Sequence, residues 1–222
     1  MIEVFSFEQC SPEWYAARLG LPTASEFHTV LAKGKNGGAS LTRKTYLNKL
    51  AGEIITGEPA ESYSNPFMER GKQMEVEARE LYAFITDANL EQVGFVKNGN
   101  VGCSPDSLIG SDGALEIKTK TAHLLIDLLR KDEFPPEHEA QCQGVLWVTG
   151  REWIDIACYW PKLPLFVKRA YRNEGYIANL AGAVKQFTDE LAQTVEMVRT
   201  YGNPEARSAG LKKQLQGILD AG

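Results

Sequence analysis

The chain has 222 residues, of which 43% are hydrophobic and 24% charged, and its formal net charge is −5. This composition is typical of a soluble enzyme and argues against a protein that binds nucleic acid through bulk positive charge alone. No apolar run reaches the roughly 18 residues of a membrane-spanning helix, so we expect no membrane segment. An acidic N-terminus and scattered cysteines favour the cytoplasm.

Helical periodicity, capping signals and short apolar runs predict an alternation of strands and helices. In chain order we expect a strand at 1–10, helices at 11–18, 23–31, 41–56 and 65–85, strands at 91–97, 100–103 and 114–120, helices at 122–131 and 136–148, strands at 152–160 and 164–171, and a helix at 174–201.

This alternation predicts an α/β fold with a central mixed β-sheet and helices on both sides. We find no internal repeat and no linker, so residues 1–202 are expected to form a single domain. Residues 203–222 are expected to be a C-terminal tail with a helical apolar spacing.

Two carboxylates and an ammonium group are spaced for a shared site on a hairpin. Asp106 precedes a turn of the sequence Gly-Ser-Asp-Gly, and Glu116 and Lys118 follow it on one face of a predicted strand. Carboxylates suit Mg²⁺ or Mn²⁺, and a lysine suits a phosphate ester. The alternative is a polar hairpin whose charges are solvated.

Two further side chains are candidates for the same site. Glu75 lies at the edge of the apolar face of the helix at 65–85, where it either points inward or pairs with Arg79. Gln141 shares a face with apolar residues of the helix at 136–148, whereas Gln143 is the less inward choice. Gln141 could orient water or be a satisfied core amide.

Basic and hydroxyl side chains near the N-terminus form a second candidate cluster. Arg18 and Ser25 flank a Leu-Pro break, and Ser25 lies in the first turn of a helix that Thr23 is expected to cap. A helix N-terminus with a nearby arginine can bind phosphate, although a simple capping cluster is the alternative. Lys33 and Lys35, on a glycine-rich loop, could follow a DNA backbone or keep the loop soluble.

These blocks together resemble the PD-(D/E)xK nucleases, and more narrowly the phage lambda exonuclease and YqaJ-type viral recombinase nuclease family. The resemblance rests on motifs in the family order, which are Arg18-Leu19-Gly20, Thr23-Ala24-Ser25-Glu26, Gly71-Lys72-Gln73-Met74-Glu75, Cys103-Ser104-Pro105-Asp106, Leu115-Glu116-Ile117-Lys118 and Ala140-Gln141-Cys142-Gln143. Val145 stands where related nucleases carry a tyrosine four residues after the glutamine, which favours the phage branch.

The resemblance implies a restriction-endonuclease-like fold and specific residue roles. Metal would be held by Asp106, Glu116, the main-chain carbonyl of Ile117 and Glu75, with two Mg²⁺ ions per site and Mn²⁺ as a substitute. Water would be positioned or activated by Lys118 and Gln141, so the catalytic set is Glu75, Asp106, Glu116, Lys118 and Gln141. A 5′-phosphate would be held by Arg18, Ser25 and Ser104.

The implied activity is 5′→3′ degradation of one strand of linear double-stranded DNA, which leaves 3′ overhangs for a single-strand annealing protein. The resemblance also implies that the protein forms a homotrimeric ring, acts in the cytoplasm of a bacterial host and is encoded by a phage or prophage. Phe67 and Met68 could wedge the duplex end open or merely pack at the helix start. Alternatives are a restriction- or repair-type endonuclease of the same superfamily and a non-catalytic DNA-binding scaffold.

Overall fold

The structure is a computed structural model that describes residues 1–60 and 66–203, with the side chains of residues 66–69 and 72 outside the described part. Strands and helices alternate along the chain and form the expected mixed α/β fold, with sheet strands between helical layers. The predicted tail helix falls on residues 204–222, which lie outside the described residues.

The described strands form two sheets. The first is antiparallel, in the order β1-β3-β4, and contains β1 (Ile2–Phe5), β3 (Phe95–Asn98) and β4 (Val101–Cys103). The second is mixed, in the order β2-β5-β6-β7-β8, with β6 and β7 parallel and the other pairs antiparallel. Its strands are β2 (Leu90–Glu91), β5 (Ser107–Ile109), β6 (Gly113–Thr119), β7 (Trp153–Tyr159) and β8 (Phe166–Tyr171).

Several helices begin or end at residues that favour capping. Ser11 and Ser40 accept hydrogen bonds from backbone N–H groups of the first turn, and Gly57 and Gly150 end helices in the left-handed conformation. The helices are α1 (Pro12–Arg18), α2 (Phe27–Leu31), α3 (Leu41–Thr56), α4 (Pro66–Thr86), α5 (Ala122–Lys131), α6 (Glu139–Thr149) and α7 (Glu174–Arg199), with single 3₁₀ turns η1 (Ala24–Glu26) and η2 (Pro136–His138).

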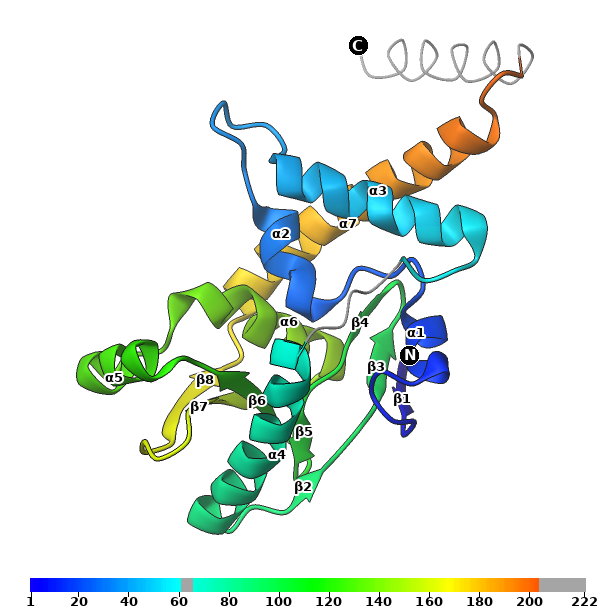
Figure 1. The fold of residues 1–222 in the computed structure, drawn as a ribbon. Helices are drawn as coiled ribbons and strands as arrows, with labels where there is room; N and C mark the ends of the chain where they lie inside the picture. The colour runs from blue at the N-terminus through cyan, green and yellow to red at the C-terminus, as the bar shows by residue number, and fades with distance from the viewer. Residues whose placement is uncertain (61–65, 204–222) are drawn as a thin grey trace.

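Helices cover both faces of the mixed sheet. On one face α4 crosses β6 and β7, as Figure 1 shows, and buries Met74, Ala78 and Tyr82 against Leu115 and Ile117. On the other face α6 packs against β6 and β7 and also contacts β3 and β4, so it joins the two sheets. The pair α3 and α7 packs together at the upper end of the view. Alternate residues of β6 therefore face two different helical layers.

One expected strand is in fact two. Residues 91–97 contribute to β2 and β3, which belong to different sheets. Gly94 lies between them, its backbone N–H donates to the Phe5 carbonyl at 2.8 Å, and an added Cβ would lie 2.0 Å from the Phe7 carbonyl oxygen. The N-terminal segment around Phe7 thus packs directly against Gly94, and the strand is interrupted there.

The loop between α1 and η1 is held by α3. The Glu53 carboxylate, 8% exposed, accepts a hydrogen bond from the backbone N–H of Gly20 at 2.9 Å. The Tyr46 hydroxyl accepts from the backbone N–H of Thr23 at 3.2 Å, and burial raises the pKa of Tyr46 to about 12. These buried contacts hold the segment that carries the N-terminal candidate cluster.

Candidate active site

Strand β6 presents the candidate carboxylate and ammonium on the face that α6 covers. Leu115 and Ile117 pack against α4, so Glu116 and Lys118 point to the opposite side of the sheet. The Glu116 side chain is buried at 3% exposure, and Lys118 is half-buried. The predicted placement of both residues on one face of a buried strand is confirmed.

Asp106 reaches the same place from the segment between β4 and β5. Its backbone N–H donates to the Leu115 carbonyl at 3.1 Å, and its Oδ2 accepts from the backbone N–H of Ile117 at 2.5 Å. The hairpin that brings it there is β5–β6, since residues 101–103 pair with β3 in the other sheet. Asp106 therefore lies where the chain passes from one sheet to the other.

The two oxygens of Glu116 have different surroundings. Oε1 accepts a hydrogen bond from Gln141 Nε2 at 2.5 Å and lies 2.8 Å from Lys118 Nζ. Oε2 is buried and has no hydrogen-bond partner within the described part of the chain. A buried carboxylate oxygen without a partner is costly, so this atom requires a cation or a ligand proton.

Negative charge is concentrated around Asp106. Burial, followed by the nearby charges of Glu116 and Glu75, holds the pKa of Asp106 well above its usual range. Burial alone would lower the pKa of Lys118, but the charge of Glu116 and its hydrogen bond outweigh burial, and the net pKa is raised. Lys118 is therefore an ammonium ion at neutral pH, and it offsets only part of the carboxylate charge.

Glu75 satisfies both interpretations of its position on α4. Its Oε1 lies 2.5 Å from Arg79 Nη2, which is the helical pair expected at this spacing. The same residue lines a cavity of about 430 Å³ together with Asp106, Gln9 and Arg79. The structure thus brings Glu75 to the carboxylate cluster while Arg79 partly neutralises it.

These residues fit a divalent cation. Within residues 1–60 and 66–203 no set of three His, Cys, Asp or Glu side chains is already arranged around one point. However, the partnerless Glu116 Oε2 and the raised pKa of Asp106 are both features that a cation between these carboxylates would relieve. Hard oxygen donors of this kind suit Mg²⁺ or Mn²⁺.

The N-terminal cluster assembles around the Ser104 hydroxyl. Arg18 Nη1 donates to Ser104 Oγ at 3.2 Å, and Arg18 Nη2 donates to Thr23 Oγ1 at 3.4 Å. Ser25 is exposed, and its hydroxyl lies 3.3 Å from Thr23 Oγ1. Burial lowers the pKa of Arg18. The structure therefore brings Arg18, Ser25 and Ser104 together, and Ser104 is two residues from Asp106.

The capping role expected of Thr23 is wrong. Its side chain makes no capping hydrogen bond, and the Glu26 carboxylate accepts from Thr29 Oγ1 at 2.9 Å instead. The Thr23 hydroxyl accepts a hydrogen bond from Arg18, so a residue that was predicted to be a helix cap belongs to the N-terminal cluster. The predicted helix at 23–31 is correspondingly short, with one 3₁₀ turn before α2.

The remaining DNA-binding candidates are two lysines of a loop and two residues at the start of α4. Lys33 and Lys35 are exposed on the loop between α2 and α3, which the Gly34 N–H closes by donating to the Gly38 carbonyl at 2.7 Å. Phe67 and Met68 are in the first turns of α4, but their side chains lie outside the described part. Lys33 and Lys35 therefore lie on a different element from the carboxylates of β6 and of the segment before β5.

Gln143 is more deeply buried than the sequence suggests. It is 2% exposed, its Nε2 donates to the Tyr171 carbonyl at 2.9 Å, and its Oε1 accepts from the Asn173 N–H at 3.0 Å. The two glutamines of α6 thus serve opposite sides of the helix, with Gln141 at Glu116 and Gln143 at the junction of β8 and α7. Helical periodicity could not separate them, because both lie among apolar residues.

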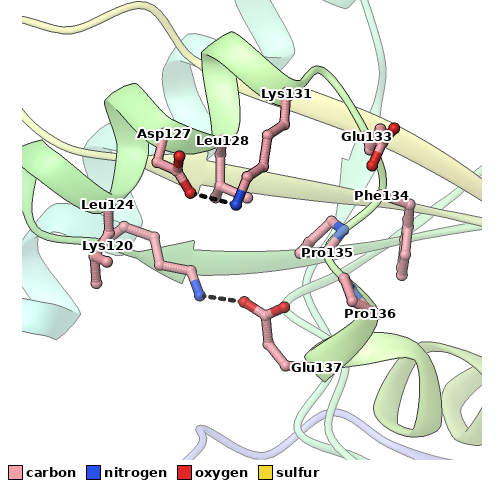
Figure 2. Close-up of a pocket in the computed structure, with 10 residues that line it drawn as sticks. All are labelled: Lys120, Leu124, Asp127, Leu128, Lys131, Glu133, Phe134, Pro135, Pro136 and Glu137. Carbon is pink, nitrogen blue, oxygen red and sulfur yellow. Dashed lines mark hydrogen bonds and ion pairs between the residues drawn. The ribbon is translucent and has the colours of Figure 1, made fainter.

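Lys120, two residues after Lys118, lines a cavity of about 260 Å³ together with Glu137, and Figure 2 shows the two side chains facing each other. Lys120 Nζ donates to Glu137 Oε1 at 3.2 Å and lies 3.0 Å from His138 Nε2. Burial, then the charges of Lys120 and Lys118, lowers the pKa of His138 to about 4. His138 stands at no recognisable ligand spacing, so its contact with Lys120 is visible only in the structure.

A family model for the YqaJ-like viral recombinase domain matches residues 13–152, which is more than half of the chain. The chain belongs to this family. The matched range spans all candidate site residues from Arg18 to Gln141. No curated protein sequence matches the chain.

Solved structures agree with membership of the YqaJ-like family. The chain is similar to LHK-Exo in complex with dAMP, with 31% identity over 90% of this chain and 100% of that one, at a TM-score of 0.78. It is also similar to LHK-Exo, an alkaline exonuclease from Laribacter hongkongensis, with 30% identity, the same coverage and a TM-score of 0.77. The expectation of an exonuclease-type enzyme is confirmed.

A more distant structure supports the fold alone. The phage-related exonuclease from Haemophilus somnus 129PT is 14% identical over 80% of this chain and 96% of that one, at a TM-score of 0.60. The YqaJ-like family member therefore has the restriction-endonuclease-like architecture that its motifs implied. None of its described helices has both the length and the apolar character needed to cross a membrane.

Proposed function

We propose that this chain is a metal-dependent exonuclease that degrades one strand of linear double-stranded DNA from its 5′ end. The observation that carries the proposal is the direct link between two sites. Ser104 of the basic cluster and Asp106 of the carboxylate cluster are two residues apart, which spans about 7 Å of extended chain. That separation is on the scale of one nucleotide, so a terminal phosphate on Arg18 places the following phosphodiester near Asp106.

In this mechanism the carboxylate cluster holds the cations. Asp106, Glu116, the Ile117 carbonyl and Glu75 are the proposed ligands, with two Mg²⁺ ions and Mn²⁺ as a substitute. Bound ions would supply Lewis-acid chemistry and a nucleophilic water at neutral pH. Lys118, whose ammonium lies 2.8 Å from Glu116 Oε1, is proposed to stabilise the negative charge that builds on the phosphate. Gln141 fixes the Glu116 carboxylate and orients water beside it.

The N-terminal cluster sets the direction of digestion. Arg18 and Ser104 are proposed to bind the 5′-phosphate, with Ser25 at the exposed edge, because a guanidinium fork and hydroxyls match phosphate oxygens. Each cut exposes a new 5′-phosphate, so the same contacts serve every step. The products would be mononucleotides and a 3′ overhang, on which a single-strand annealing protein can act.

The ring and the DNA path belong to the same proposal. A domain with a radius of gyration of roughly 17 Å does not encircle a duplex alone. A protein with a net charge of −5 gains little retention from bulk charge, so a closed homotrimer would hold the substrate topologically. Lys33 and Lys35 would then follow the backbone and Phe67 and Met68 would separate the strands. The proposed setting is the bacterial cytoplasm, with a phage-type origin.

Digestion of linear and closed circular duplexes tests this function. With Mg²⁺ the protein should degrade linear 5′-phosphorylated duplex and leave covalently closed circles intact, and EDTA should stop the reaction. Linearised or nicked circles would instead indicate an endonuclease. Molar mass in solution, measured alongside, should equal three chains if the ring forms.

A further inference from the structure

Trp14 lies inside the basic cluster, although it is outside the set of residues that the motifs assign to phosphate. Helix α1 presents Trp14 and Arg18 four residues apart, on one face. The Trp14 Nε1–H lies 2.9 Å from Ser104 Oγ and 3.0 Å from the Gly94 carbonyl, so a single donor is shared between both oxygens. The Arg18 guanidinium carbon lies 4.0 Å from the centre of the Trp14 ring.

The contacts of Ser104 decide the direction of its hydroxyl proton. A serine hydroxyl has two acceptor positions and a single donated hydrogen. Trp14 Nε1–H and Arg18 Nη1–H occupy the acceptor side, and neither nitrogen can accept a hydrogen bond in return. No hydrogen bond donated by Ser104 is found within residues 1–60 and 66–203. The Ser104 hydroxyl hydrogen is therefore free to be donated to a ligand, and an anion such as phosphate needs a hydrogen-bond donor of this kind.

The indole also restricts Arg18. Stacking on Trp14 fixes the plane of the guanidinium, and Phe95 lies on a second side at 5.7 Å from ring centre to Arg18 Cζ. Two of the N–H groups of Arg18 donate to Ser104 and Thr23, which leaves the rest of the five for a ligand. A preset guanidinium loses less conformational entropy when it binds phosphate.

We propose that Trp14 is a positioning residue for 5′-phosphate recognition, which presets the Ser104 hydroxyl as a donor and holds the Arg18 guanidinium by stacking. This inference rests on the proposed function, since it deepens the phosphate specificity of the same site. A purely structural tryptophan would need only the Gly94 carbonyl as its partner. The second, shorter contact to Ser104 ties the indole to the ligand-facing hydroxyl.

The experiment compares Trp14→Phe, Ser104→Ala and the double variant on short duplexes with 5′-phosphate or 5′-hydroxyl ends. Phenylalanine retains an aromatic ring beside Arg18 but lacks the N–H. We expect Trp14→Phe to raise KM for phosphorylated ends about tenfold with little change in kcat, and to leave hydroxyl ends nearly unchanged. The double variant should lose no more than Ser104→Ala alone, because the N–H acts through that hydroxyl.

Three results would overturn the proposal. They are equal losses on both kinds of end, additive losses in the double variant, and full retention of the phosphate preference by Ser104→Ala. Thermal unfolding is measured for each variant. If Trp14→Phe does not fold, the result for Ser104→Ala is used alone, because this variant keeps the hydrogen bond from Trp14 Nε1 to the Gly94 carbonyl. If the wild type does not prefer 5′-phosphorylated over 5′-hydroxyl ends, the proposed function itself is contradicted. If the wild type has this preference and Trp14→Phe keeps it in full, only the role of Trp14 is contradicted.

Discussion

Glu116 combines features that a structural carboxylate does not need. One oxygen is satisfied by Gln141 and Lys118, whereas the other is buried without a partner in the described chain. An unsatisfied buried oxygen costs about 1–3 kcal/mol or more, so a ligand that pairs with this atom would recover that free energy. A bound cation is the compensation that best fits the neighbouring carboxylates.

Glu116→Gln should separate activity from folding. The amide keeps the size and one carbonyl oxygen but lacks the negative charge, so it is a much weaker ligand for a divalent cation, and we expect activity to fall about 1,000-fold, the equivalent of several kcal/mol of lost charge stabilisation. Mg²⁺ should raise the melting temperature of the wild type but not of this variant. The matched control is Glu91→Gln, an exposed carboxylate on β2. Retained activity in Glu116→Gln would contradict the assignment.

His138 predicts a loss of stability on acidification. Its Nε2 lies 3.0 Å from the Lys120 ammonium, so the ring must be neutral to accept a hydrogen bond there. Its pKa of about 4 in the folded protein is below the ordinary 6.5, so the unfolded chain binds a proton first. The stability that His138 contributes is complete above pH 6.5 and is lost as pH falls towards 4, at up to about 1.4 kcal/mol per pH unit.

Urea unfolding between pH 7 and pH 4.5 measures this effect. The free energy of unfolding should fall less steeply in His138→Gln than in the wild type. The control, His123→Gln, changes an exposed histidine of α5 and should follow the wild-type curve. Parallel curves for His138→Gln and the wild type would contradict the argument.

At the scale of residues, sequence spacing predicted which side chains belong to the site better than it predicted the contacts that those side chains make. Glu116 and Lys118 were found because a strand places every second residue on one face, and Asp106 was found because it precedes the turn that leads into that strand. Trp14 was missed because its role depends on Ser104, which is 90 residues away, and the Thr23 hydroxyl was missed because its contact with Arg18 depends on how the Leu-Pro break between them folds. No local pattern contains such a contact.

The element that combines catalysis with architecture is α6. It contacts strands of both sheets, places Gln141 at Glu116, and places Gln143 against the segment that joins β8 to α7. The same residue type, two positions apart on one helix, therefore serves two different purposes. This pair gives a direct comparison inside a single element.

Alanine substitutions of the two glutamines should have opposite effects. Gln141→Ala should lower kcat about tenfold or more with nearly unchanged stability, because its half-buried amide contacts the catalytic carboxylate. Gln143→Ala should cost about 1–3 kcal/mol in unfolding free energy, because a backbone carbonyl and N–H lose their partner. Activity assays at a permissive temperature and urea unfolding of both variants check this, and equal effects on both quantities would contradict it.

At the scale of elements, long periodic segments were predictable and short strands were not. Helices α3, α4 and α7 follow the expected ranges closely. Strand β5 has three residues and gives no readable alternation, and the division of residues 91–97 between two sheets depends on a backbone approach at Gly94.

For the whole molecule, the net negative charge disfavours binding to DNA, and the proposed ring would retain the substrate in spite of it. The chain is acidic, yet its proposed substrate is a polyanion, so local basic groups and bound cations must do what bulk charge does not. The cluster at Arg18 and the ammonium of Lys118 are such groups. The single domain at 1–202 and the trimer both remain predictions at this scale.

The polarity of digestion tests the central claim most directly. A linear 5′-phosphorylated duplex, with one strand labelled at its 5′ end or at its 3′ end, is incubated with Mg²⁺ and either wild type or Glu116→Gln. We expect the wild type to release 5′-labelled mononucleotide first and 3′ label only late, and the variant to release neither at a comparable rate. Early release of 3′ label, internal cleavage, or an active Glu116→Gln variant would contradict it.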